Sequence, residues 1–429
     1  MDHFNYRGGE LLAEDVPLAR IAQQVGTPFY CYSTATLRRH YRVLSEALGK
    51  TNHRIYYAVK ANSNIAVIRT LGEMGAGADV VSEGELRRAQ AAGIPSDRIV
   101  FEGPGKTRAE LAYALSADIH QFNIESDAEL LALDDVARGW GVVAPIAVRV
   151  NPNVEAHPDD PHELDGIATG RKRDKFGILW PAARATYRAA AGMSGVKVVG
   201  VAMHIGSQIT DTKPFSQAFA KLREIVETLR ADGHDIQRVD LGGGLGVPYT
   251  NETPPSPADY ARAVLRETGK LDCELAFQPG RMLVANAGVL VTRVTYEKDA
   301  EGIRIVMVDA AMNDLVRPAM YKAVHTIVPV RADSGKPRPA DVVGPICESS
   351  DRFAKDWPLP PLSPGDLLAM RTAGAYGASM ASNYNTRLLV PEVLVNGSEF
   401  AVIRPRQTYE SLLAGEALPP WLAKTPGVG

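Results

Sequence analysis

The stretch Tyr-Tyr-Ala-Val-Lys-Ala-Asn (YYAVKAN, residues 56–62) brings a short apolar run to a lysine, Lys60. The run is rich in residues that favour β-strands, so it predicts a buried strand with an ammonium group at its end. A lysine is rarely buried without a partner. Lys60 therefore either reaches solvent or takes part in chemistry. The rest of the sequence helps to decide between these two roles.

Seven further β-rich runs follow, and helix-like segments separate them. Alternation of strands and helices is typical of a parallel sheet. Eight such units within about 230 residues predict a closed (β/α)8 TIM-type barrel, so the fold class is α/β. The eight predicted strands lie at residues 54–62, 77–82, 98–103, 119–126, 145–152, 198–207, 238–244 and 274–280.

The pattern changes near residue 286, where β-rich runs alternate with turn residues and helical periodicity becomes scarce. This pattern predicts a separate C-terminal all-β domain. The early run PFYCYS (28–33) is expected to contribute one N-terminal strand to it. We therefore predict a cofactor-binding barrel over residues 35–285 and a β domain formed by residues 1–34 and 286–429.

Composition narrows the class of protein. The chain has 429 residues and a net charge of −3, so no basic field points to nucleic acid or to an anionic membrane as a partner. Its three cysteines, Cys31, Cys273 and Cys347, are widely spaced and odd in number, which argues against a disulfide framework. No signal-peptide core or membrane-length apolar run occurs. We expect a soluble cytoplasmic protein.

Candidate functional residues follow the predicted barrel strands directly. Lys60 ends the first strand, and His204 ends the sixth. The run Gly242–Gly244 ends the seventh, and Gln278–Arg281 end the eighth. Because active sites of such barrels lie at the carboxyl ends of the strands, these side chains are expected to meet in one mouth.

The glycine run at 242–244 allows backbone N–H groups to approach an anion closely, and the loops after strands seven and eight often hold a phosphate. A tight barrel corner would explain the same glycines. Two other motifs are rejected. GGGLG fails the dinucleotide spacing, and GPGKT (103–107) lacks the first glycine of a P-loop, since position 100 is Val.

A lysine opposite a phosphate cradle suggests a phosphorylated aldehyde bound as a Schiff base, which means pyridoxal 5'-phosphate. A sugar-phosphate enzyme with a Schiff-base or acid–base lysine is the open alternative. The long connection at 153–197 is a candidate functional loop. Its HPDDPH stretch (157–162) is interpreted as a polar loop, and no metal is expected.

Motifs spread along nearly the whole chain carry a family resemblance. The chain resembles the diaminopimelate decarboxylases, within the alanine-racemase-like and ornithine-decarboxylase-like pyridoxal-phosphate enzymes. The matching segments are FYCYS, YYAVKAN, GADVVSEGEL, FNIES, RVNPNV, TGRKRDKFGI, HIGSQ, DLGGGLGVPY, PGRMLVANAG, DAAMNDLVRPAMY, VVGPICES and GAYGASMASNYNTR.

The resemblance implies roles around the cofactor. Lys60 would carry pyridoxal 5'-phosphate, and His204 would stack on its ring. The remaining residues implied in cofactor binding are Ser207, Gly243, Gly244, Gln278, Gly280, Arg281 and Tyr376.

The resemblance also implies substrate contacts. Arg281, Arg317 and Tyr321 would hold the far end of the substrate, because an arginine binds a carboxylate bidentately. Tyr376 would reach both phosphate and substrate. Glu348 would take the distal ammonium group, and the neighbouring Cys347 would protonate Cα. In similar enzymes these last two enter the other subunit's site, so the resemblance implies a homodimer with shared active sites.

The implied reaction is decarboxylation of meso-2,6-diaminopimelate to L-lysine and CO2, the last step of lysine biosynthesis. Two alternatives stay open. One is a decarboxylase of ornithine, arginine or carboxynorspermidine. The other is a cofactor-binding protein with impaired activity.

Gln278 departs from the family pattern, which has a glutamate facing the pyridine nitrogen. An amide donating a hydrogen bond there would leave that nitrogen unprotonated and weaken the electron sink. We therefore expect slower decarboxylation, unless another acid compensates. Gln278→Glu should then raise the turnover number.

Overall fold

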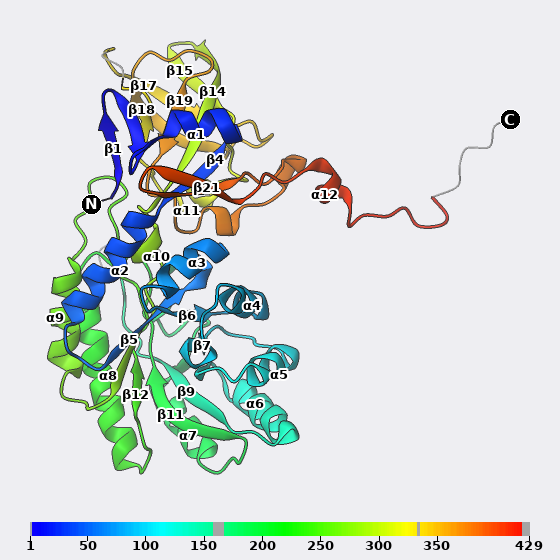
Figure 1. Ribbon diagram of the computed structural model, residues 1–429. Coiled ribbons are helices and arrows are strands. Elements are labelled where there is room, and N and C mark those ends of the chain that lie inside the picture. Colours follow the sequence, from blue (N-terminus) through cyan, green and yellow to red (C-terminus); the bar gives the residue numbers. More distant parts are fainter. Residues whose placement is uncertain (1, 158–166, 333–334, 423–429) are drawn as a thin grey trace.

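The computed structural model describes residues 2–157, 167–332 and 335–422. A barrel forms the lower part of the molecule in Figure 1, and a sheet domain caps it. The segment after the last strand leaves the body as an extended arm that includes a short helix, α12 (Tyr409–Leu413).

The barrel confirms all eight predicted strands. They are parallel, and the last pairs with the first through Leu275 and His53, which closes the sheet. They are β5 (His53–Ala58), β6 (Gly77–Val80), β7 (Ile99–Phe101), β8 (Gln121–Ile124), β9 (Ala144–Asn151), β11 (Val196–Ala202), β12 (Arg238–Asp240) and β13 (Glu274–Phe277).

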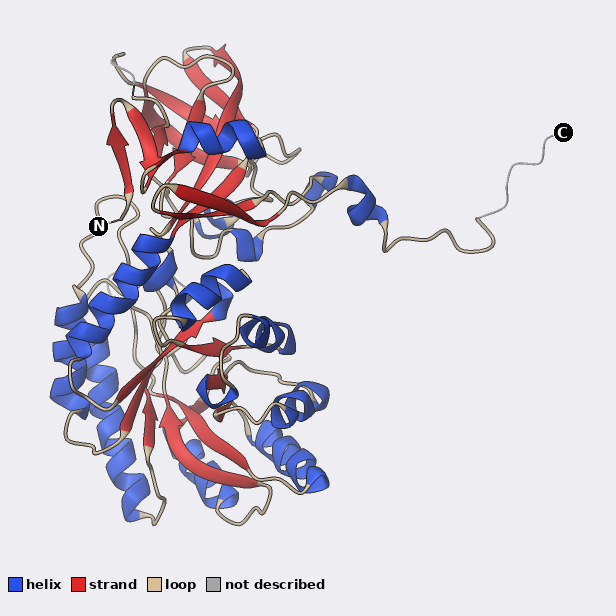
Figure 2. Ribbon diagram, in the orientation of Figure 1, coloured by secondary structure: helices blue, strands red, loops and turns tan. Residues whose placement is uncertain are grey.

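Helices surround these strands (Figure 2). They are α2 (Thr34–Leu48), α3 (Ile65–Gly72), α4 (Glu83–Ala91), α5 (Arg108–Ser116), α6 (Asp127–Trp140), α7 (Trp180–Ala190), α8 (Lys213–Ala231), α9 (Pro257–Thr268) and α10 (Arg281–Val284).

Strand-to-helix turns in the barrel use capping side chains. Ser82 and Ser126 each accept a hydrogen bond from the backbone N–H three residues later, where α4 and α6 begin. Thr107 and Ser256 form full capping boxes at the starts of α5 and α9. Such caps satisfy N–H groups that a helix start leaves unpaired. Each turn is thus encoded locally.

The second sheet contains the N-terminal strand, as predicted. β4 (Phe29–Ser33) pairs antiparallel with β14 (Gly288–Ala300) and parallel with β20 (Glu392–Asn396). The other strands are β15 (Ile303–Val308), β16 (Ile327–Pro329), β17 (Arg338–Val343), β18 (Arg352–Leu359), β19 (Leu367–Met370) and β21 (Glu399–Arg404).

Smaller elements complete this part of the molecule. Three short strands, β1 (Phe4–Arg7), β2 (Glu10–Ala13) and β3 (Val16–Pro17), form a separate sheet. They are followed by α1 (Leu18–Val25), and α11 (Arg317–Tyr321) lies between β15 and β16. The division at residues 35 and 285 stays a prediction.

The β domain departs from the sequence pattern at two strands. β17 ends at Val343, so Cys347 lies in the loop that follows it. Strand β18 was not anticipated, because Lys355, Asp356 and Pro358 interrupt its apolar pattern. The strand forms because it pairs antiparallel with β17.

The connection after β9 is more than a loop. It contains the two-residue strand β10 (Ile178–Leu179), which pairs with β9, and then α7. Within HPDDPH only His157 is described, and positions 158–162 lie outside the described residues. No helix in the described part of the chain has the length and apolarity to cross a bilayer.

The β domain meets the barrel beside Lys60. The backbone N–H of Tyr376 donates to the carbonyl of Ala61 at 2.7 Å, and Asn62 Nδ2 donates to the carbonyl of Gly374 at 3.1 Å. The carboxyl end of β5 is therefore covered by the second domain, which encloses the mouth of the barrel.

Candidate active site

A cavity of about 660 Å³ lies at the carboxyl ends of the barrel strands. It is lined by most of the residues expected from the sequence, namely Lys60, His204, Ser207, Gly243, Gly244, Gln278, Gly280, Arg281, Arg317, Tyr321 and Tyr376. The structure thus brings together residues that follow four barrel strands, β5, β11, β12 and β13, with residues of the β domain.

Lys60 follows β5, and its Nζ lies 2.6 Å from Oδ2 of Asp79. The Asp79 side chain is fully buried, whereas 39% of the Lys60 side chain is accessible, through the cavity that it lines. Burial alone would lower the pKa of Lys60, but the Asp79 carboxylate raises it above its ordinary value. The lysine is therefore a paired group that faces the cavity.

His204 follows β11 and lines the same cavity. Burial, then the positive charges of Arg149 and Lys60, lower the pKa of its imidazole to about 3. Its Nδ1 accepts from the backbone N–H of Gly243 at 3.3 Å, which neutral imidazole allows. The imidazole ring of His204 is therefore uncharged near neutral pH and presents a flat surface.

The glycine run after β12 permits a close approach of backbone segments. A Cβ on Gly243 would collide with the backbone oxygen of Gln278, and one on Gly244 with the backbone oxygen of Gly206. Gly244 also has φ of +111°, which disfavours other residues. The tight corner is therefore present and lines the cavity, and its use as a phosphate cradle stays a prediction.

Arg281 and Arg317 are buried at another part of the cavity wall. Arg281 Nη1 donates to Tyr249 Oη at 2.6 Å, and its guanidinium contacts Ser207 Oγ at 3.0 Å. Arg317 donates to His325 Nε2 at 2.9 Å and lies 4.5 Å from the Tyr249 ring centroid. Neither guanidinium has a carboxylate partner among the described residues. Two buried positive charges without an acid are a site for an anionic ligand.

Tyr376 forms part of the same wall. The Arg281 guanidinium lies 4.9 Å from its ring centroid. Its φ of +54° is unusual for a residue with a Cβ. Its backbone N–H donates a hydrogen bond to the carbonyl of Ala61, next to Lys60, and this bond helps to stabilise the strained conformation.

Cys347 and Glu348 lie outside this cavity. Both are exposed; the Cys347 N–H donates to Asn385 Oδ1 at 2.9 Å, and Glu348 accepts from Tyr384 Oη at 2.8 Å. The single chain therefore does not bring them to Lys60. Their assignment to a neighbouring subunit's site stays a prediction.

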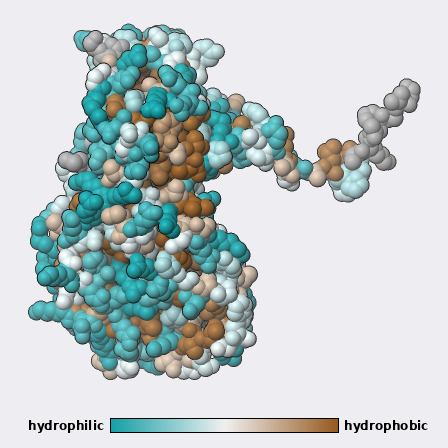
Figure 3. Space-filling model, viewed as in Figure 1, coloured by the Kyte–Doolittle hydropathy of each residue, from teal (hydrophilic) through white to brown (hydrophobic). Residues whose placement is uncertain are grey.

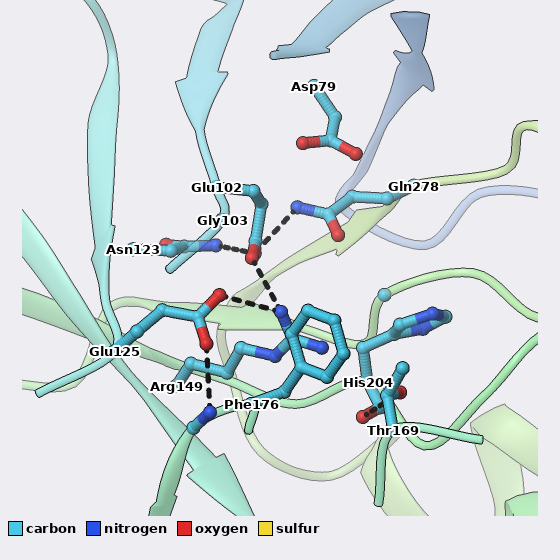
Figure 4. A network of polar contacts seen from close by, with 12 residues as sticks. Asp79, Glu102, Gly103, Asn123, Glu125, Arg149, Thr169, Phe176, His204 and Gln278 are labelled. Atoms are coloured by element: carbon cyan, nitrogen blue, oxygen red, sulfur yellow. Dashed lines mark hydrogen bonds and ion pairs between the residues drawn. The ribbon is translucent and has the colours of Figure 1, made fainter. Parts of the chain in front are cut away.

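A buried polar network under the cavity was missed from the sequence (Figure 4). Glu102 Oε2 lies 3.4 Å from Arg149 Nη1, and Glu125 Oε1 lies 2.7 Å from the same nitrogen. Asn123 and Asp240 belong to the same network. Each is a polar residue that interrupts or ends an apolar barrel strand, as in RIVFE and VRV, and that interruption was the available signal.

The expectation for Gln278 was wrong in one respect. Its amide nitrogen does not face the cavity, because Nε2 donates to Glu102 Oε1 at 3.1 Å and to Asp240 Oδ2 at 2.7 Å. An amide nitrogen has only two hydrogens, so none remains for a ring nitrogen.

These residues fit pyridoxal 5'-phosphate. The cavity offers an amine on Lys60, a neutral flat ring on His204 and a backbone cradle at Gly243 and Gly244 that a Cβ would fill. The aldehyde, the aromatic ring and the phosphate of the cofactor match these features in turn.

The low pKa of buried histidines predicts acid sensitivity. Burial, then Arg317, lower the pKa of His325 to about 3, whereas an unfolded histidine has a pKa near 6.5. The unfolded chain then binds more protons, so stability falls as pH drops from about 6.5 toward 3. Between pH 6.5 and 5 each such histidine should cost roughly 2 kcal/mol.

His325→Gln can keep both hydrogen bonds, to Arg317 and to the carbonyl of Arg371, without the ionisation. We expect its denaturant midpoint to fall less steeply over this pH range than that of the parent. Equal slopes for the two proteins would contradict this prediction.

Comparison with known proteins identifies the family. The family model described as "Pyridoxal-dependent decarboxylase, pyridoxal binding domain" matches residues 34–285. The diaminopimelate decarboxylase of Vibrio cholerae is 48% identical over 424 residues, which cover 98% of this chain and 100% of that protein. That of Pseudomonas aeruginosa is 49% identical over 422 residues, with the same coverage of both chains.

Among solved structures, the diaminopimelate decarboxylase of M. jannaschii in complex with L-lysine superposes with a TM-score of 0.93. It is 38% identical, and the match covers 98% of this chain and 99% of that one. From its pyridoxal-binding barrel to its β domain, the chain belongs to the diaminopimelate decarboxylase family of pyridoxal-dependent decarboxylases.

Proposed function

We propose that this protein decarboxylates meso-2,6-diaminopimelate to L-lysine and CO2 with pyridoxal 5'-phosphate. The observation that carries the proposal is one cavity that contains Lys60 and two buried arginines, for which the described residues supply no acid partner. Diaminopimelate has two amino-acid ends, so one carboxylate remains when the other leaves as CO2. Arg281 and Arg317 offer that remaining carboxylate bidentate partners.

Each residue around the cofactor is assigned to a different part of it. Lys60 Nζ would hold its aldehyde, His204 would support its ring, and Ser207 with the backbone of Gly243 and Gly244 would hold its phosphate. When bound, the cofactor accepts the electron pair of the breaking Cα–carboxylate bond. The enclosing β domain keeps water from the reacting carbon.

After CO2 leaves, Cα must accept a proton to give the product. We assign this to Cys347 Sγ of a second subunit, with Glu348 of the same loop holding the distal ammonium group. A thiol with a reference pKa of about 8.5 can donate a proton near neutrality.

A homodimer follows from this assignment. It is supported by the exposure of Cys347 and Glu348 and of the neighbouring Tyr384, which bonds Glu348. Met320 and Val324, which flank the substrate-binding Tyr321, are also exposed large apolar side chains. Figure 3 shows apolar side chains exposed on the β domain near the root of the C-terminal arm. A second copy of the chain would cover such surfaces.

Shared sites predict complementation between inactive subunits. A Lys60→Ala subunit and a Cys347→Ala subunit should each be inactive alone. When they are mixed under conditions that exchange subunits, random pairing should restore about a quarter of the sites. Recovery of lysine formation measures this. If the mixture stays inactive while mixed dimers are shown to form, Cys347 does not act across the interface.

The substrate is tested by a panel. Purified holoenzyme is given meso-diaminopimelate, ornithine, arginine or carboxynorspermidine, and CO2 and amine products are measured. We expect turnover of diaminopimelate alone at a substantial rate, because the other substrates lack the second amino-acid end. Faster turnover of ornithine, or no turnover of any substrate by cofactor-loaded protein, would contradict the proposal.

The place of action is proposed to be the cytoplasm. Cys31, Cys273 and Cys347 are all free thiols in the structure. Unpaired cysteines agree with a reducing compartment, where disulfides are rare.

A further inference from the structure

Two buried carboxylates hold the side-chain amide of Gln278 in one orientation. Nε2 donates to both Glu102 and Asp240, so both amide hydrogens are in use. Turning the amide over would place its oxygen against two acidic groups. The nitrogen therefore stays on this side, and the oxygen stays on the other.

The carbonyl oxygen of Gln278 faces the cavity. Figure 4 shows it on the side of Arg149 and His204, away from Asp79, and no described residue donates a hydrogen bond to it. Asn123 Nδ2 donates to the same Glu102 and Asp240 oxygens. The amide nitrogens of Asn123 and Gln278 thus donate to the two acids, and the Gln278 oxygen takes no part in these hydrogen bonds. A ligand at this position therefore meets a hydrogen-bond acceptor, the carbonyl oxygen of Gln278.

Glu102 carries the negative charge of this cluster. Burial opposes ionisation, but Arg149, then hydrogen bonds from Asn123 and Gln278, lower the pKa of Glu102 to about 2. Burial, and then the charge on Glu102, raise the pKa of Asp240 well above its usual range. Of these two acids, Glu102 is therefore the one whose ionised form is favoured.

The other charges around the amide are balanced by closer partners. Arg149 lies 2.7 Å from Glu125 but 3.4 Å from Glu102, and Lys60 lies 2.6 Å from Asp79. His204 is neutral, as described above. Glu102 is therefore the ionised acid in hydrogen-bond contact with Gln278, and both residues line the cavity.

We propose that Glu102 acts through Gln278 to keep the ring nitrogen of bound pyridoxal phosphate protonated. The ring N–H donates to Gln278 Oε1, and the amide N–H of Gln278 donates to the ionised Glu102. A chain of hydrogen bonds that ends in a charge polarises each member. Glu102 is thus a positioning residue, and Gln278 need not weaken the electron sink. The inference rests on the cofactor part of the proposed function.

The protonation state of the ring nitrogen can be read directly. Holoenzyme is prepared with pyridoxal phosphate labelled with ¹⁵N in the ring, and its ¹⁵N chemical shift is recorded by NMR. The parent is expected to show a protonated nitrogen. Glu102→Gln keeps the shape but removes the charge, so its signal should move to the unprotonated range and kcat should fall by roughly a hundredfold.

Glu129→Gln is the matched control. It removes a buried carboxylate that pairs with Lys106 at 2.7 Å and contacts neither Gln278 nor Arg149, so the nitrogen should remain protonated. The transposed double variant, Glu102→Gln with Gln278→Glu, should restore the protonated signal. If Glu102→Gln does not fold, Gln278→Met leaves the acid in place, interrupts the chain and should give the same unprotonated signal.

Two results would overturn the inference. One is an unprotonated nitrogen in the parent, and the other is a protonated nitrogen that persists in both Glu102→Gln and Gln278→Met. A parent protein that shows no visible absorption of bound cofactor would instead contradict the proposed function itself. The two failures are therefore distinguishable.

Discussion

Lys60→Ala should lower kcat for diaminopimelate by roughly 10³-fold or more, since it removes both the amine that holds the cofactor and a group placed for proton transfer. The variant also leaves the buried Asp79 without its only described partner, because Oδ1 of that carboxylate already has none. Loss of activity alone would therefore not separate chemistry from folding.

The variant Lys60→Arg separates a loss of chemistry from a loss of folding. It keeps a positive charge for Asp79 but cannot form the covalent bond to an aldehyde. We expect near-parental thermal unfolding with the same collapse of kcat, measured by lysine release in a coupled assay. Substantial turnover by Lys60→Arg would show that the lysine is not the covalent attachment point.

Arg149→Met should destabilise the barrel by about 3–5 kcal/mol, because it removes a buried cation from two buried acids. Its guanidinium pairs with Glu125 and Glu102 and lies 4.9 Å from the Phe176 ring. Denaturant unfolding with bound cofactor measures the loss.

Two companion variants test the reason for that loss. Arg184 pairs with Asp232 at the surface with good geometry, so Arg184→Met should cost less than about 1 kcal/mol. Adding Glu125→Gln to Arg149→Met should recover part of the stability, because one unpaired charge is removed. A milder Arg149→Met, similar to Arg184→Met, would contradict the buried-charge explanation.

Much of the fold could be predicted from local signals. The eight strands carry apolar β-forming runs, and capping residues such as Ser82 and Thr107 mark where the following helices begin. The convergence of Lys60, His204 and the glycine run followed from one geometric rule about parallel barrels. Strand β18 escaped because its stability comes from pairing with β17 and not from its own pattern.

The connections within the polar network were beyond such reasoning, although the polar residues that interrupt the strands were visible in the sequence. Glu102 and Gln278 are 176 positions apart in the chain, yet their side chains bond directly. Which amide hydrogens are used depends on Asp240 and Asn123, which come from two further strands. The direction of one amide group therefore required three-dimensional placement, and the proposal for the ring nitrogen follows from that direction.

The most direct test of the account is to locate the cofactor on the chain. Borohydride reduces a carbon–nitrogen double bond between an aldehyde and a lysine, and peptide mass spectrometry then finds the labelled residue. We predict the pyridoxyl mass on the peptide that contains Lys60, and no labelling of Lys60→Arg. A label on another lysine, such as Lys106 or Lys175, or no label in protein that binds the cofactor, would contradict it.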